Sequence, residues 1–73
     1  MTKEELLEKI KSEGYTVNLT VANDCLYCSA TDTSYYLNQI EIIDEFTFIE
    51  NNVTKTLKTV KSSEYNLKGY FIN

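Results

Sequence analysis

The chain has 73 residues, a net charge of −4, two Gly, two Cys and no His, which suits one domain spanning residues 1–73. Folding at this length buries only about 60% of the unfolded chain's surface, so we expect a homo-oligomer whose second copy completes the core. Without His or a Gly-rich phosphate loop we expect no catalysis and no cofactor.

The N-terminus, residues 1–5, has no basic start followed by an apolar stretch, and no later apolar run approaches the roughly 18 residues of a membrane span. We therefore expect a cytoplasmic protein without a membrane partner. Thr2 and Glu5 form a capping-box pattern that predicts a helix from residue 3, and Gly14 suits the left-handed position beyond its end.

Residues 15–22 alternate between apolar and polar side chains, which predicts a strand with one buried face. Cys25–Cys28 is expected to return as the second strand of a hairpin, and the polar residues 29–34 are expected to form a loop. The fold class is therefore α+β, with one N-terminal helix packed on an antiparallel sheet of four or five strands.

The second half of the chain predicts three further strands, at residues 40–49, 53–61 and 67–72, with turns between them. In the first of these strands, regular alternation places the larger apolar side chains on one face, namely Ile40, Ile42, Phe46 and Phe48. Asp44 interrupts this face, and we expect it to pair with a lysine such as Lys58 or to cap a loop. An alternative role for Asp44 is a polar contact at a ligand or subunit surface.

Lysines and tyrosines provide the candidate binding residues. Residues 53–73 carry four Lys and one Glu, whereas residues 1–52 carry three Lys and ten acids. One interpretation is that Lys on outer strands prevents pairing with another chain. The other is a site for a small anionic ligand, in which Lys binds phosphate and Tyr stacks on a base. Its candidate residues are Lys55, Lys58, Lys61, Lys68, Tyr70, Tyr65, Tyr35 and Tyr36. Tyr also favours protein interfaces.

Cys25 and Cys28 form a Cys-x-x-Cys pair, which supplies two of the four ligands of a structural zinc. On a strand their odd spacing directs the sulfurs to opposite faces, which favours thiols that only pack. Zinc shared between two subunits and redox chemistry remain as alternatives.

Four short segments form a recognisable series along the chain: Glu13–Thr16, Cys25–Cys28, Ile43–Glu45 with Phe48, and Lys68–Gly69. In their order and approximate spacing they resemble a family of small bacterial and phage domains often labelled phosphoribosylpyrophosphate synthetase. The label implies a transferase, but this chain has neither the phosphoribosyl-binding loop nor the His of such an enzyme. The resemblance therefore implies a fold rather than an activity, and the short stand-alone chain suits a phage or mobile-element protein.

Two functions follow from these observations. The first is a homo-oligomer that sequesters a small anionic ligand of the nucleotide type, suited to a phage acting against a host signal. The second is a protein-interaction module whose acidic N-terminal part, with Glu4, Glu8 and Glu13, docks on a basic surface of a host protein. General nucleic-acid binding is not expected, because the net charge is negative and Arg is absent.

Overall fold

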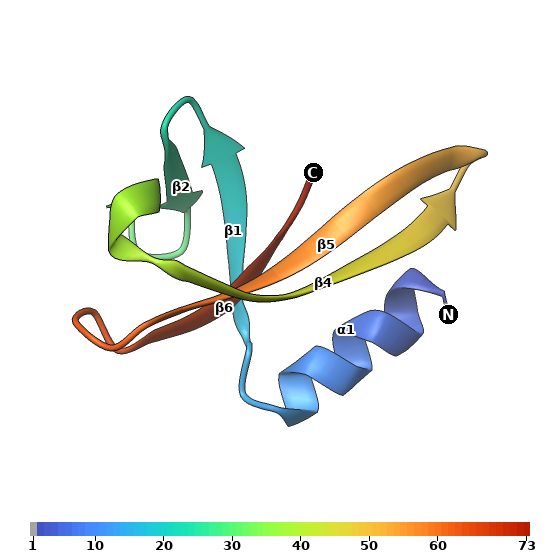
Figure 1. The fold of residues 1–73 in the computed structure, drawn as a ribbon, viewed down its shortest axis with the longest axis horizontal. Helices are drawn as coiled ribbons and strands as arrows, with labels where there is room; N and C mark the ends of the chain where they lie inside the picture. Colours follow the sequence, from blue (N-terminus) through green and yellow to red (C-terminus); the bar gives the residue numbers. More distant parts are fainter. Residues whose placement is uncertain (1) are drawn as a thin grey trace.

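The computed structural model describes residues 2–73 as one helix and one six-stranded sheet (Figure 1). No helix among these residues is long and apolar enough to cross a membrane. In chain order the elements are α1 (Lys3–Ser12), β1 (Val17–Ala22), β2 (Cys25–Cys28), β3 (Thr33–Tyr36), the 3-10 turn η1 (Leu37–Gln39), β4 (Glu41–Glu50), β5 (Val53–Ser62) and β6 (Leu67–Ile72).

The local signals at the two ends of α1 are confirmed. The Thr2 hydroxyl accepts a hydrogen bond from the Glu5 backbone N–H at 3.2 Å, and the Glu5 carboxylate accepts one from the Thr2 N–H at 3.3 Å. Gly14 has φ +97°, the left-handed conformation expected after the helix. A helix of this length needs such caps together with tertiary packing, because short isolated helices are marginal in water.

The sheet differs from the predicted one in strand number and in direction. Its strand order is β3-β2-β1-β6-β5-β4, so it has six strands, not four or five. β1 and β6 run parallel, so the sheet is mixed rather than antiparallel. The additional strand is β3, which pairs with β2. It begins inside the predicted loop of residues 29–34 and ends two residues beyond it. Its sequence, Thr-Ser-Tyr-Tyr, does not alternate between apolar and polar residues and so gives no period-two signal, although half-buried and exposed positions alternate along the strand.

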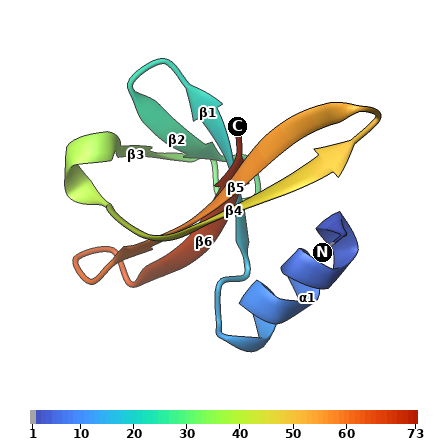
Figure 2. The ribbon, with the colours of Figure 1, turned by 45° about the vertical axis from the view of Figure 1, so that its right-hand side comes forward.

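The connection from β3 to β4 requires the sheet to curl. A flat sheet of six strands spaced about 4.8 Å apart would separate its edges by roughly 24 Å. β3 and β4 are these edges, and the link of residues 37–40 spans at most about 18 Å even when fully extended. Three of its residues are wound into η1, which shortens the link further (Figure 2). The two edges are therefore drawn toward each other, and one face of the sheet becomes concave.

Each face of the sheet buries its own apolar cluster. The cluster on the α1 side contains Leu6, Ile10, Phe48, Leu57 and Tyr70. The cluster on the opposite face contains Leu19, Leu26, Cys28, Val60, Leu67 and Phe71. The inner strands β5 and β6 supply both clusters through alternate residues, and this two-sided burial holds the domain together.

A β-bulge in β4 overturns the predicted face of its apolar side chains. Ile42 lies opposite Val60 whereas Phe46 lies opposite Leu57, and the register shifts between Ile42 and Asp44. One extra residue in a strand reverses the faces of all residues beyond it. Ile42 is therefore on the other side of the sheet from Phe46 and Phe48, and Ile40 likewise packs against the cluster that contains Val60.

Gly69 is the point at which β6 meets β1, and the sheet tolerates no side chain there. A Cβ atom on Gly69 would lie 2.6 Å from the backbone oxygen of Val17 and 3.1 Å from a methyl of Leu19. We predict that Gly69→Ala lowers the free energy of unfolding by about 2 kcal/mol or more, because backbone atoms must shift to admit the methyl group.

Urea denaturation followed by circular dichroism measures this change. Asn18→Ala, at an exposed position of β1, is the control and should shift the free energy of unfolding by less than about 0.5 kcal/mol. Equal stability of Gly69→Ala and the unmodified chain would contradict the close approach of β1 and β6.

Candidate functional site

The structure makes neighbours of only two of the four predicted lysines, Lys61 and Lys68. Lys55 lies near the β4–β5 turn, where its Nζ is 2.9 Å from a Glu50 oxygen. Lys61 lies opposite Lys68 across β5 and β6, and Lys58 lies on the other face of the sheet, opposite Glu45. The predicted alternation of Lys58 with Lys55 and Lys61 is confirmed, but these side chains do not converge on one ligand.

The interpretation of these lysines as edge protection is wrong. β5 lies between β4 and β6, and β6 lies between β5 and β1, so both strands are internal. The outer strands of the sheet are β3 and β4, which contain no lysine.

Lys68 is engaged in holding the end of α1. Its Nζ donates to the backbone oxygen of Glu13 at 2.7 Å and lies 4.6 Å from the centre of the Tyr15 ring. A cation near the last carbonyls of a helix is favoured by the helix dipole, and the ring adds a cation–π contact. The position of Lys68 is thus explained by the fold.

The candidate tyrosines are also dispersed. Tyr70 is buried beneath α1, at 6% exposure, and so presents no open ring for stacking. Tyr35 packs against the other apolar cluster and makes an edge-to-face contact with Tyr65, with ring centroids 5.5 Å apart. Tyr36, on the outer strand β3, is 61% exposed. Within one chain the candidate lysines and tyrosines do not surround a common space, so the anionic-ligand site stays a prediction.

Cys25 and Cys28 face opposite sides of β2, as their spacing predicted. Cys25 is half-buried and its thiol donates to the Ala22 carbonyl at 3.0 Å, whereas Cys28 is buried within the apolar cluster. A hydrogen bond from the Thr31 hydroxyl, joined by backbone N–H groups, holds the pKa of the Cys28 thiol below its usual value. Residues 2–73 contain no group of three or more His, Cys, Asp and Glu arranged to hold a metal.

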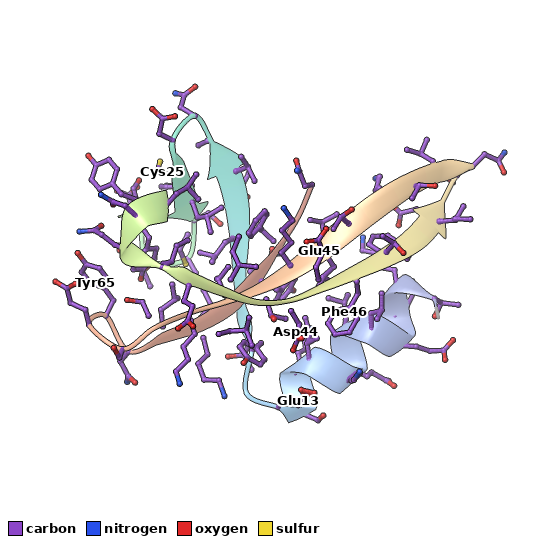
Figure 3. All side chains as sticks on the ribbon, viewed as in Figure 1. Glu13, Cys25, Asp44, Glu45, Phe46 and Tyr65 are labelled. Carbon is purple, nitrogen blue, oxygen red and sulfur yellow. The ribbon has the colours of Figure 1, made fainter. Side chains whose placement is uncertain are left out.

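The acids of β4 take different neighbours from those predicted. Asp44 lies opposite Thr59, and Glu45 is the residue opposite Lys58. The Asp44 backbone N–H donates to the Thr59 hydroxyl at 3.0 Å, so a side chain replaces a backbone acceptor at the bulge. The Asp44 and Glu45 side chains point to opposite sides of the strand (Figure 3) and are both exposed.

The open edge of β4 is the feature that best fits a binding site. β4 has ten residues, and β5 occupies only one side of it. The Asp44 N–H points toward β5, and backbone groups alternate in direction along a strand. The N–H and C=O groups of Glu45, Thr47 and Ile49 therefore point outward, away from β5.

A shallow groove lies beside this part of the edge. Its volume is about 600 Å³, which falls within the range of small binding sites. One wall is the beginning of α1 and the other is the end of β4; the lining residues are Thr2, Lys3, Glu4, Thr47, Phe48, Ile49, Glu50 and Thr54.

Glu50 joins the two walls of this groove. Its carboxylate lies 2.9 Å from the Lys55 Nζ and 3.5 Å from the Lys3 Nζ, so it ties the first turn of α1 to the β4–β5 hairpin. The Lys55 hydrogen bond, followed by the charges of Lys3 and Lys55, holds the pKa of Glu50 below its usual value.

The sequence did not identify this site. Residues 40–49 were correctly predicted as a strand, but the outer position of a strand depends on which distant strands pair. The signal in the sequence was the large number of apolar side chains in this strand. In the structure several of them are exposed: Ile42 is 50% exposed and Ile49 is 74% exposed. An apolar side chain so exposed on a strand indicates that no other layer covers it.

The lowered pKa of Glu50 predicts a pH-dependent contribution to stability. A carboxyl whose pKa is lower in the folded state stabilises above its unfolded pKa, and this contribution is lost as the pH falls through the folded pKa. We predict that Glu50→Gln lowers the Tm at about pH 7, and that its difference from the unmodified chain shrinks toward zero below about pH 4.

Thermal unfolding across this pH range measures the difference. Glu64→Gln, in the exposed turn between β5 and β6, is the matched control and should show little difference at any pH. If the Tm difference between Glu50→Gln and the unmodified chain stays constant down to about pH 3, the Glu50 charge has no role in stability.

Comparison of the chain with protein-family models, curated proteins and solved structures gives no match. The family resemblance at Glu13–Thr16, Cys25–Cys28, Ile43–Glu45 with Phe48, and Lys68–Gly69 therefore stays a prediction.

Proposed function

We propose that this chain is a non-catalytic protein-interaction module that docks on a basic region of a partner protein through β4. The observation that carries the proposal is the composition of this outer strand. β4 holds four acids and no lysine, and its exposed apolar residues include Ile42, Ile43 and Ile49.

The charge on β4 is only partly compensated within the chain: on β5, Lys61 lies opposite Glu41 and Lys58 lies opposite Glu45, but neither pair is close enough to form an ion pair among residues 2–73. The two ion pairs among residues 2–73 both use Glu50, which leaves Glu41, Asp44 and Glu45 without an ion-pair partner in the described chain. These three side chains are exposed, so they act on solvent and on approaching molecules. A partner with complementary charge would be steered toward this strand and selected by it.

α1 adds less to this charge than the sequence suggested. Lys3, Lys9 and Lys11 balance Glu4, Glu5 and Glu8, so the helix itself is electrically neutral. Lys9 also lies 4.8 Å from the centre of the Phe46 ring, close to β4. The acidic surface is therefore centred on β4, with Glu4 at the adjoining groove and Glu13 beyond the end of the helix.

A purely protective role for the β4 acids explains less of the strand. Natural proteins place charges and bulges on outer strands to prevent association, and β4 has both. Protection alone would favour a short or polar edge, yet this strand is ten residues long and exposes three isoleucines. The combination of acids with exposed apolar side chains supports a selective contact, in which apolar burial adds to charge attraction.

The first test is to neutralise the two adjacent acids. We predict that Asp44→Asn combined with Glu45→Gln weakens partner binding about tenfold, because two charges near the contact are removed. Asp24→Asn combined with Glu64→Gln removes the same charge from two exposed turns and should leave binding unchanged.

Both double variants are used as bait in pull-downs at low and high salt, and the affinity for the recovered partner is then measured by calorimetry. A partner that binds both double variants equally would contradict the proposal. So would a partner whose binding increases with salt, because screening weakens charge attraction.

The proposal also predicts the behaviour of nucleotides. A nucleotide that bound the folded chain would raise the Tm as its concentration passed its Kd. We expect no rise for mono-, di- and cyclic nucleotides at about 1 mM, because the lysines and tyrosines do not converge. A clear and saturable rise would instead support the anionic-ligand function.

A further inference from the structure

We infer that the partner binds as an additional β-strand along residues 45–49 of β4. This inference deepens the proposed function and rests on it. It specifies an extended partner segment with basic and apolar side chains, held by backbone hydrogen bonds in the groove between β4 and the start of α1.

The first support is the direction of the backbone groups. Asn73 and Thr56 exchange backbone hydrogen bonds at 2.8 and 3.3 Å, so the backbone of Thr56 points toward β6. By alternation, Leu57 directs its groups to β4, where Phe46 is its partner. Phe46 therefore bonds to β5, and Thr47 faces outward, in agreement with the direction of the Asp44 N–H.

The second support is the position of the β-bulge. It lies between Ile42 and Asp44, at the start of the strand, and distorts the edge there. Beyond it the register to β5 continues without a break from Asp44 to Glu50, as far as the Asn51–Asn52 turn. The regular stretch of the edge therefore includes the part of β4 that borders the groove, residues 47–50.

The side chains along this stretch define the chemistry of the partner segment. Glu45, Thr47 and Ile49 share the face turned away from α1, because Phe46 and Phe48 occupy the other. A strand running antiparallel to β4 would place an apolar residue beside Ile49 and, four residues later, a Lys or Arg beside Glu45. Such cross-strand pairs stabilise antiparallel sheets, and main-chain bonds add affinity.

A second copy of this chain is a poorer occupant of the edge. Pairing two β4 strands would bring together eight carboxylates, four from each copy, and no lysine from either strand. Like charges across adjacent strands are destabilising. The homo-oligomer expected from the chain length would therefore use another surface.

The test uses a defined peptide, acetyl-Val-Thr-Val-Thr-Lys-Thr-Lys-amide, carrying a fluorophore. We predict measurable binding to the intact chain by fluorescence anisotropy, and binding at least about tenfold weaker when the Val and Lys amides are N-methylated. N-methylation of the Thr amides is the matched control, because those amides point away from β4. The same peptide with Glu in place of Lys should not bind.

A second variant tests the edge from the side of the protein. Thr47→Pro removes an outward N–H, which an outer strand tolerates, and should weaken peptide binding about tenfold. Thr47→Val keeps this N–H and should bind normally. Thermal unfolding by circular dichroism establishes whether each variant is folded. The N-methylated peptides test the backbone hydrogen bonds independently of any protein variant, because they are used with the unmodified chain.

Each outcome decides the inference. Strand addition is supported if binding is lost only when the Val and Lys amides of the peptide are N-methylated. It also requires that the bound peptide slows hydrogen exchange at the Thr47 and Ile49 amides. Equal binding of all the basic peptides overturns strand addition but leaves charge-driven docking in place. No binding at millimolar peptide also overturns strand addition, and the Asp44 and Glu45 variants then test the proposed function separately. A dimer of this chain whose Thr47 and Ile49 amides are protected from hydrogen exchange would assign the edge to a second copy, which overturns the inference of a partner strand.

Discussion

The parallel contact between β1 and β6 at Gly69 determines which parts of this molecule are covered and which are open. Val17 lies opposite Gly69, and its backbone oxygen occupies the space that a side chain would need. This contact joins the three strands β1 to β3 with the three strands β4 to β6 in one sheet. It makes β6 and β5 internal, and it leaves β4 as an outer strand.

The curl of the sheet follows from the same arrangement. With β1 inserted beside β6, the two strands joined by η1 lie at opposite edges of the sheet, and the short link draws those edges together. The concave face then encloses Leu26 and Val60, while α1 covers the other face. The helix begins beside the end of β4, fixed there by the contact of Lys3 with Glu50. The groove is thus a consequence of how the helix and sheet close their two cores.

Local features of the fold were predictable, and distant pairings were not. The capping box at Thr2 and Glu5, the left-handed Gly14 and the Cys25–Cys28 strand depend on neighbouring residues. The parallel pairing of β1 with β6 joins segments about fifty residues apart and has no local signal. The strand Thr33–Tyr36 was missed because its pairing with β2, rather than its own apolar pattern, places it in the sheet.

The candidate site shows the same division. Alternation correctly separated Lys58 from Lys55 and Lys61, but their strand proved to be internal, where the side chains diverge over two faces. The bulge at Ile42 and Asp44 was also not visible in the sequence, because the Thr59 hydroxyl that accepts from the Asp44 N–H comes from a distant position. Sequence reasoning identified the chemical groups, whereas the identity of the open edge required the complete strand order.

The acids of β4 serve two requirements that are usually in conflict. An outer strand with exposed isoleucines risks pairing with copies of itself, and carboxylates on every copy oppose that association. The same carboxylates attract a strand of opposite charge, so protection from self-association and choice of partner arise from one set of side chains. Selectivity then depends on where the charge lies relative to the open backbone. Glu45 lies beside the outward groups of Thr47, so a basic segment gains charge attraction and backbone bonding in the same register.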